Sequence, residues 1–199
     1  MKTKALLVPI IVAGAMIFTA CNQKVDEKTM TDVTQFGNDW TAMGEKASNW
    51  SVQLTETANH AKEFANKQSE MMNTWSTSKD EAMKMKMQEM TKTAMDNSTH
   101  LDAMVNDWTT WKTSWDENTK AFTEWQNKVV KGEVTPDQAQ KDLADWKTKM
   151  TDAQQKMDNW TTAFNSVKES YNKTMAMSDE MSKSMTTPSN MTPKEKSKK

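Results

Sequence analysis

The strongest constraint on the fold is a seven-residue repeat of apolar side chains that continues through most of the chain. Within each repeat the apolar positions are separated alternately by four residues and by three, which places them along one side of an α-helix. A half-buried strand would alternate with a period of two, so the repeat excludes a sheet. The first stretch has two rows: Phe36, Met43, Trp50, Thr57, Phe64 and Met71, and beside them Trp40, Ala47, Leu54, Ala61, Gln68 and Trp75.

Two further stretches continue the pattern in a new phase, and each pair of rows is called a seam below. The second seam consists of Met83, Met90, Asn97, Met104, Trp111, Asn118 and Trp125, with Met87, Ala94, Leu101, Trp108, Trp115, Phe122 and Val129. The third consists of Ala139, Trp146, Ala153, Trp160, Val167, Thr174 and Met181, with Leu143, Met150, Met157, Phe164, Tyr171, Ser178 and Met185. Every tryptophan, tyrosine, phenylalanine and leucine after residue 21 lies on a seam. Such seams must be buried, and their period of 3.5 predicts a left-handed supercoil.

Helix-start signals separate the three stretches. Ser78 followed by Glu81 forms a capping-box pattern, in which each side chain bonds a backbone N–H of the other end of the turn. The segment 131–138 (KGEVTPDQ) has a glycine that ends a helix, a threonine N-cap, a proline at the first helical position and a glutamine that completes a capping box. The sequence therefore predicts helices over about 31–77, 79–131 and 136–186.

Three helices of this length, joined by short turns, bury their seams most economically as an elongated antiparallel three-helix bundle or coiled coil of the all-α class. At 1.5 Å per residue the bundle is about 70–75 Å long. Its layout is similar to that of a spectrin repeat. Counting residues outward from the turns places Trp50, Trp108 and Trp160 at one level. The same count gathers methionines around the first turn, at the opposite end from residue 21.

The first 20 residues have the pattern of an export signal. Lys2 and Lys4 precede an apolar run over 5–18, which is shorter than the roughly 20 residues that a membrane-spanning helix needs. The run leads to 18–21 (FTAC), and Cys21 is the only cysteine of the chain. These four residues resemble the bacterial lipobox, although Phe18 stands where that family usually has leucine.

The lipobox resemblance implies that signal peptidase II removes residues 1–20 and that Cys21 carries a diacylglycerol and an amide-linked acyl chain such as palmitate. Residues 21–30 would then form a lipidated tether that attaches the protein to a membrane of the bacterial cell envelope. Asn22 follows the cysteine. Because aspartate at this place commonly marks retention in the inner membrane of Gram-negative bacteria, asparagine indicates the outer membrane.

Few residues offer catalytic chemistry. His60 and His100 are the only histidines, they fall on different predicted helices, and no second cysteine completes a zinc site. The sequence contains no glycine-rich phosphate loop and no nucleophile elbow. A formal net charge of -1 does not favour nucleic acid. We therefore predict a protein that is not an enzyme, needs no cofactor and does not bind nucleic acid.

A metal-binding alternative comes from the methionines. Residues 83–90 (MKMKMQEM) resemble the methionine-rich stretches of periplasmic copper- and silver-handling proteins, whose soft thioether sulfurs select Cu(I). Methionine on a seam is ordinary core filler. The off-seam candidates for Cu(I) or Ag(I) are Met72, Met85, Met175 and Met177. The tryptophan rows likewise allow two interpretations, core packing or stacking on a sugar, and their placement on the seams favours the core.

The C-terminal segment 187–199 ends in KEKSKK and is predicted to be a disordered, lysine-rich tail. A lipidated cysteine, a heptad rod and a terminal lysine together resemble Braun's lipoprotein in layout, although that family has one helix and a Tyr-Arg pair before its lysine. The resemblance implies, as a hypothesis, a covalent link from Lys199 to peptidoglycan.

The leading prediction is a membrane-anchored, non-enzymatic spacer or interaction scaffold of the cell envelope, with peptidoglycan or envelope proteins as partners. Binding of Cu(I) or Ag(I) by the methionine-rich end is the alternative from a different functional class. Self-association through an open bundle is a third possibility, and the sequence leaves the oligomeric state open.

Overall fold

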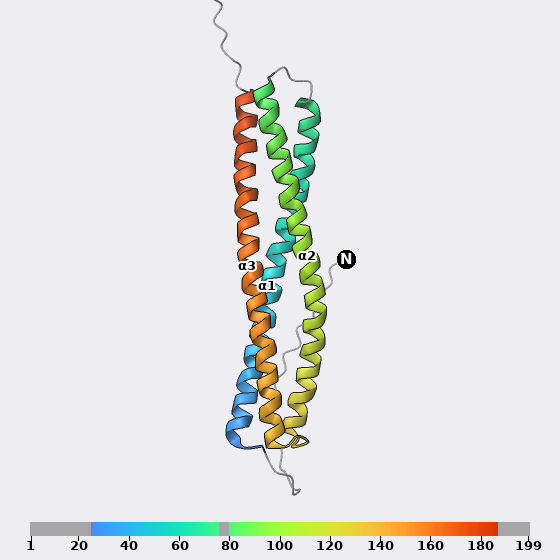
Figure 1. Cartoon of the computed structure of the whole chain (residues 1–199), viewed down its shortest axis with the longest axis vertical. Coiled ribbons are helices and arrows are strands. Elements are labelled where there is room, and N and C mark those ends of the chain that lie inside the picture. Colours follow the sequence, from blue (N-terminus) through green and yellow to red (C-terminus); the bar gives the residue numbers. More distant parts are fainter. Residues whose placement is uncertain (1–24, 76–79, 187–199) are drawn as a thin grey trace, which may run out of the picture.

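The computed structural model describes residues 25–75 and 80–186, and nearly all of them are helical. Helix α1 spans Glu27–Trp75, α2 spans Glu81–Val130 and α3 spans Pro136–Thr186. Figure 1 shows the three helices side by side in an up-down-up arrangement. The predicted elongated antiparallel three-helix bundle is therefore confirmed. The end that holds the start of α1 and the α2–α3 turn is called the proximal end below, and the opposite end the distal end.

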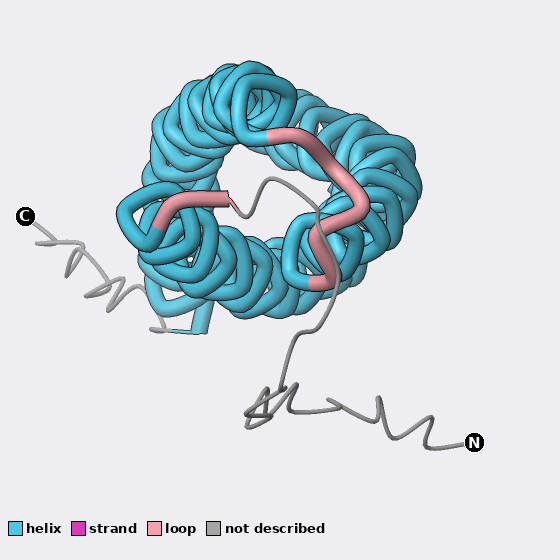
Figure 2. Tube along the Cα trace, turned by 90° about the horizontal axis from the view of Figure 1, so that it is seen from below, coloured by secondary structure: helices cyan, strands magenta, loops and turns pink. Residues whose placement is uncertain are grey.

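The three seams form the core. Every seam residue whose side chain the structure describes is buried or half-buried. Leu54 of α1, Leu101 of α2 and Met157 of α3 are at most 1% exposed, and one connected cluster of buried apolar side chains includes residues of all three helices. Seen along the rod, the helices surround a common axis (Figure 2). The heptad pattern thus determines which face each helix turns inward.

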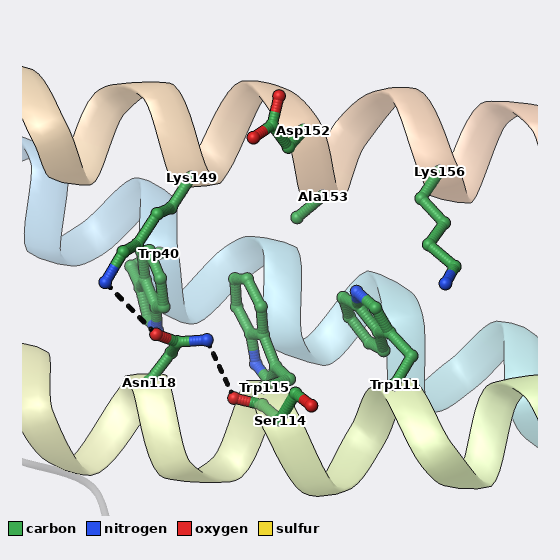
Figure 3. A pocket seen from close by; sticks show the side chains of 9 residues that line it. All are labelled: Trp40, Trp111, Ser114, Trp115, Asn118, Lys149, Asp152, Ala153 and Lys156. Atoms are coloured by element: carbon green, nitrogen blue, oxygen red, sulfur yellow. Dashed lines mark hydrogen bonds between the residues drawn. The ribbon is translucent and has the colours of Figure 1, made fainter.

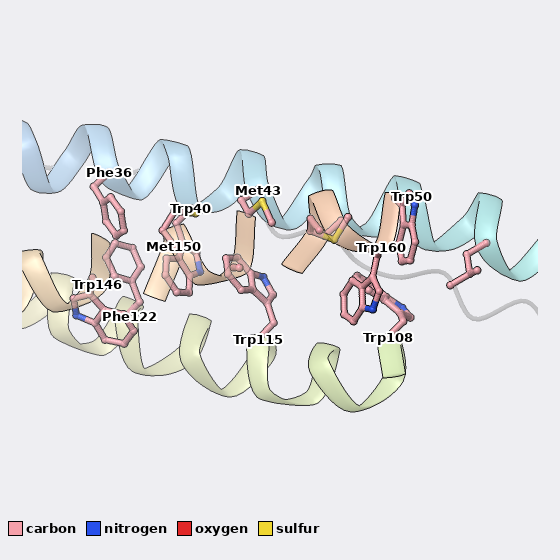
Figure 4. Close-up of a cluster of buried hydrophobic side chains, with 14 of the residues drawn as sticks. Phe36, Trp40, Met43, Trp50, Trp108, Trp115, Phe122, Trp146, Met150 and Trp160 are labelled. Atoms are coloured by element: carbon pink, nitrogen blue, oxygen red, sulfur yellow. The ribbon is translucent and has the colours of Figure 1, made fainter. Parts of the chain in front are cut away.

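Aromatic rings fill the proximal half of the core (Figure 4). Trp50 lies parallel to Trp160, with ring centroids 5.6 Å apart, and meets Trp108 edge-on at 5.8 Å. The predicted level of these three tryptophans is therefore confirmed. Aromatic pairs in such geometries contribute about 0.5–1.5 kcal/mol beyond the burial of their area. Because one ring comes from each helix, this level fixes the alignment of all three helices.

The start of α1 differs from the prediction, because the helix begins at Glu27 and not at 31. Asp26 precedes it, and one carboxylate oxygen accepts the backbone N–H of Thr29 at 2.9 Å while the other accepts the Thr29 hydroxyl at 2.8 Å. Both bonds stabilise the charged carboxylate and lower the pKa of Asp26. The last residues of the predicted tether over 21–30 are thus helical, since the Asp26 carboxylate at the N-cap accepts an orphan backbone N–H of the first turn.

The start of α2 corrects a second prediction. Asp80, in extended conformation, is the N-cap, and its side chain accepts the backbone N–H of Met83 at 3.0 Å. The helix therefore begins at Glu81 and not at 79. Ser78, the predicted cap, lies outside the described residues. Aspartate and serine are about equally good N-caps, so the sequence alone offered two competing starts.

The α2–α3 turn has the geometry that its sequence predicts. Gly132 has a φ of 70°, a left-handed conformation that favours glycine, and its N–H donates to the carbonyl of Val129 at 3.0 Å. The hydroxyl of Thr135 then accepts the N–H of Gln138 at 3.4 Å, with Pro136 at the first position of α3. The Gln138 side chain donates to Asp142 at 2.6 Å, so the glutamine half of the predicted capping box is not formed.

Two glycines of α1 allow α2 to approach closely. A Cβ atom added at Gly44 would lie 3.2 Å from Nε1 of Trp115, and one added at Gly37 would lie 2.7 Å from Nε2 of Gln126. The glycines are seven residues apart, so both face the same neighbour. This contact draws α1 and α2 together beside the aromatic core.

The distal part of the core is more polar. The side-chain amide of Gln68 donates to the Ser178 hydroxyl at 2.8 Å, between α1 and α3, and both side chains are buried. Thr91 of α2 donates to the backbone carbonyl of Gln68 at 3.3 Å. Oε1 of Gln68 and Nδ2 of Asn97 are buried without a hydrogen-bond partner in the structure. Buried polar atoms of this kind lower stability, so this part of the core combines a polar contact between helices with a cost.

Candidate functional site

A column of stacked rings runs through the proximal half of the bundle. Trp40 lies parallel to Trp115 at 4.3 Å, and Phe122 and Trp111 extend the stack on either side, each at 5.2 Å. Since neighbouring rings cover both faces of Trp115, only its edge can face α3. The edge of an aromatic ring carries the positive part of its quadrupole, so the column presents a weakly positive apolar surface.

A hollow of about 280 Å³ lies over this column, between α2 and α3 (Figure 3). We call it the Trp111 hollow. It exists because α3 has the small Ala153 at the level where α2 has two indoles. Trp111 is half-buried, whereas Trp115 and Trp40 are only 9% and 3% exposed. The lining residues are Trp40, Trp111, Ser114, Trp115, Asn118, Lys149, Asp152, Ala153 and Lys156.

Two lysines of α3 stand at the two ends of the Trp111 hollow (Figure 3). Lys149 donates to the side-chain oxygen of Asn118 at 3.3 Å, and its ammonium lies 4.1 Å from the ring centroid of Trp146. Lys156 places its ammonium 5.0 Å from the ring of Trp160. Within the described part of the chain, neither lysine forms an ion pair. The Asp152 carboxylate points away from the rings in Figure 3, so the hollow has a net positive rim.

The methionine candidates of the distal end do not gather in one hollow. Met85 is 67% exposed and lies in a shallow depression formed by α2 alone. Met177 is 47% exposed and lines a separate hollow between α2 and α3, whereas Met72 is half-buried on α1. Met175 lies two residues before Met177, and residues at this spacing point to nearly opposite sides of a helix. Binding of Cu(I) or Ag(I) by these four residues stays a prediction.

The hollow beside Met177 has a different charge balance from the Trp111 hollow. Lys173 forms an ion pair with Glu169 at 2.6 Å, and this hydrogen bond lowers the pKa of the Glu169 carboxyl. Nearby, burial raises the pKa of the Tyr171 hydroxyl, and the charge of Glu63 adds to the effect. The cation of this hollow is thus already neutralised by a neighbour.

The other sequence candidates are exposed or lie outside the described residues. His60 and His100 are both exposed. Within residues 25–75 and 80–186, no group of three or more histidine, cysteine, aspartate or glutamate side chains could hold a metal ion. None of the helices in these ranges is long and apolar enough to cross a membrane. Cys21, the signal over 1–20, the first part of the tether over 21–24 and the tail over 187–199 with Lys199 are not among the described residues.

The Trp111 hollow is a feature that the seam pattern did not predict. A seam position indicates that a residue faces its partners, but a hollow depends on which side chains meet across helices. The usable signal was the small Ala153 between Trp146 and Trp160 on a seam otherwise rich in large residues. Comparisons of the chain with protein-family models, with curated proteins and with solved structures gave no match.

Proposed function

We propose that the protein is a lipid-anchored, non-enzymatic spacer or interaction scaffold of the bacterial cell envelope, held by an acylated Cys21. The observation that carries the proposal is the continuous burial of three seams along one rod. A bundle that buries its seams along helices of 49 to 51 residues is stiff and elongated. Such a rod can hold a surface at a defined distance from its anchor.

The direction of the rod follows from where the chain enters it. Helix α1 starts at the proximal end, only six residues after Cys21. A lipid on Cys21 would therefore lie near the α2–α3 turn, and the distal end would be the part farthest from the membrane. From Met85 to the end of α2 the helix rises by about 70 Å.

The anchor is tested by mass spectrometry of the N-terminal peptide from membranes of producing cells. We expect a peptide that begins at Cys21 and carries the mass of a diacylglycerol and an acyl chain. Cys21→Ser should abolish that mass and release the protein from the membrane fraction. An unacylated peptide that begins elsewhere, or a variant that stays equally in the membrane, would contradict the anchor.

The upright rod is tested by energy transfer from a fluorophore to acceptor lipids in vesicles that contain the lipidated protein. Because Cys21 is the only native cysteine, an introduced cysteine supplies the single free thiol for labelling. Met85→Cys labels the distal end and Glu133→Cys labels the proximal turn, and both positions are exposed. We expect strong transfer from position 133 and very little from position 85. Equal transfer from both would mean that the rod lies flat, and the spacer proposal would fail.

A further inference from the structure

The Trp111 hollow has three properties that distinguish it from a simple gap in the packing. Its floor consists of ring edges, its rim has two ammonium groups, and its back wall is the methyl group of Ala153 (Figure 3). Its volume of about 280 Å³ lies just below the usual range of small-ligand sites, about 300–1,000 Å³. A hollow of this volume has room only for a small ligand, and a folded partner cannot enter it.

The chemistry of the floor selects a flat apolar body. Edge-to-face contacts are a preferred geometry of aromatic pairs, and Trp111 already makes one with Trp160, at an interplanar angle of 89°. A flat ring laid on the edges of Trp111 and Trp115 would repeat that geometry. Among the described residues, none accepts a hydrogen bond from Nε1 of Trp111, which Figure 3 shows at the end of the indole nearer α3. This N–H can donate to a ligand.

The rim selects a negative charge. Lys149 and Lys156 are seven residues apart, so their backbones are separated by about 10 Å along α3, with Ala153 between them. Neither ammonium is neutralised by a carboxylate of the described residues, and Asp152 is turned away. Two ammonium groups and a set of positive ring edges attract an anion from two directions.

We propose that the Trp111 hollow binds a small organic anion with a flat apolar body and one carboxylate or sulfonate group. The body lies over the edges of Trp111 and Trp115, and the charged group lies between the lysines and the Trp111 N–H. This site is independent of the lipid anchor, because it lies on the flank of the rod and uses none of residues 1–24.

The probe is 2-naphthoate, and its matched control is 2-naphthalenemethanol, which has the same ring system without the charge. Binding is followed by the indole N–H signals in a nitrogen–proton NMR spectrum of residues 21–199 carrying Cys21→Ser. This chain contains the whole described core, and circular dichroism checks its helix content. Trp111→Phe and Trp115→Phe assign the two signals that matter.

We expect 2-naphthoate to shift the signals of Trp111 and Trp115 and to leave that of Trp50 in place. It should bind at least fivefold more tightly than the neutral alcohol. The double variant Lys149→Gln and Lys156→Gln should remove this preference, whereas Lys141→Gln with Lys147→Gln, two exposed lysines of α3 outside the hollow, should keep it. Ala153→Leu should block binding of both probes by filling the hollow.

Three results would overturn the proposal. The first is equal affinity for the two probes, which means adsorption to apolar surface without charge selection. The second is a loss of affinity with the Lys141 and Lys147 pair as large as with the Lys149 and Lys156 pair, which means a general effect of net charge. The third is a shift of indole signals throughout the core, which means that the probe enters a loosened bundle and not a site.

Discussion

Two buried tryptophans of α1 allow the same substitution to be compared in two hydrogen-bonding environments. Nε1 of Trp40 donates to the hydroxyl of Thr119 at 2.9 Å, whereas Nε1 of Trp50 is buried without a partner in the structure. Both side chains are nearly inaccessible, at 3% and 8% exposure. Trp40→Phe and Trp50→Phe therefore remove the same ring atoms from similar surroundings and differ in the fate of one N–H group.

The difference between the two variants can be worked out from that group. The smaller ring leaves a similar cavity in each case, so this contribution cancels to first order. Trp40→Phe also loses a hydrogen bond with a net value of about 0.5–1.5 kcal/mol, while Trp50→Phe removes an unsatisfied donor whose burial costs about 1–3 kcal/mol. Trp40→Phe should therefore lower the free energy of unfolding by about 1.5–4.5 kcal/mol more than Trp50→Phe does.

Urea unfolding followed by far-ultraviolet circular dichroism measures both values, provided that the variants keep the same dependence on urea. Thr119→Val is the control, because it removes the acceptor. In a double-mutant cycle the coupling between Trp40→Phe and Thr119→Val should be about 1 kcal/mol. If Trp50→Phe destabilises the bundle as much as Trp40→Phe, the hydrogen-bonding argument is refuted.

Three further perturbations have expected outcomes. Asp26→Ala should lower the melting temperature above pH 3.8, the ordinary pKa of aspartate, because the charged Asp26 carboxylate stabilises the folded state and its pKa is lowered there. The difference in melting temperature between the two proteins should shrink as the pH falls below this value, and a constant difference would contradict the cap. Gly37→Ala should raise the melting temperature, because alanine favours a helix and the flexible end of Gln126 can move away from the new methyl group. Gly44→Ala should not raise it, because Trp115 is held between two rings and cannot move; equal gains would contradict this packing. Peroxide should oxidise Met85 and Met177, 67% and 47% exposed, before Met87 and Met90, 1% and 2% exposed, as mass spectrometry of peptides can show; equal rates would mean that the distal core opens.

The helices and their alignment could be predicted because they depend on many residues at once. Every large aromatic side chain of the described core obeys one period, and moving a helix by one residue would turn its whole seam toward solvent. The level of Trp50, Trp108 and Trp160 followed from the same pattern and from the length of the turns alone. Packing of this kind is determined by periodicity, which the sequence contains in full.

The helix starts and the hollow could not be predicted in the same way. The first turn of α2 had two good caps within three residues, and the choice between Ser78 and Asp80 depends on local geometry that propensity does not resolve. The Trp111 hollow depends on the close approach of α1 to α2 at Gly44, and on a small residue of α3 facing two indoles. The contacts that form the hollow join residues far apart in the chain, so the local pattern shows a small residue at position 153 but not the residues that face it.

The two halves of the core select the same alignment by different means. In the distal half, Gln68 of α1 bonds Ser178 of α3, two parallel helices that no turn joins directly. A shift of α3 by one heptad would place Tyr171 or Met185 opposite Gln68 and leave its buried amide without the Ser178 hydroxyl. Losing the partner of a buried polar group costs about 1–3 kcal/mol, although the hydrogen bond itself contributes less.

In the proximal half, the same shift would replace Trp160 by Ala153 or Val167 opposite Trp50 and break a parallel stack at 5.6 Å. Removing a large ring from such a contact costs about 3–5 kcal/mol, as core truncations do. A bundle of repeating seams could slip by a heptad at little cost if all its core residues were alike. The polar pair near the distal end and the tryptophan level near the middle of the rod therefore penalise one and the same slip, and a rod that cannot slip has the fixed length that the proposed spacer needs.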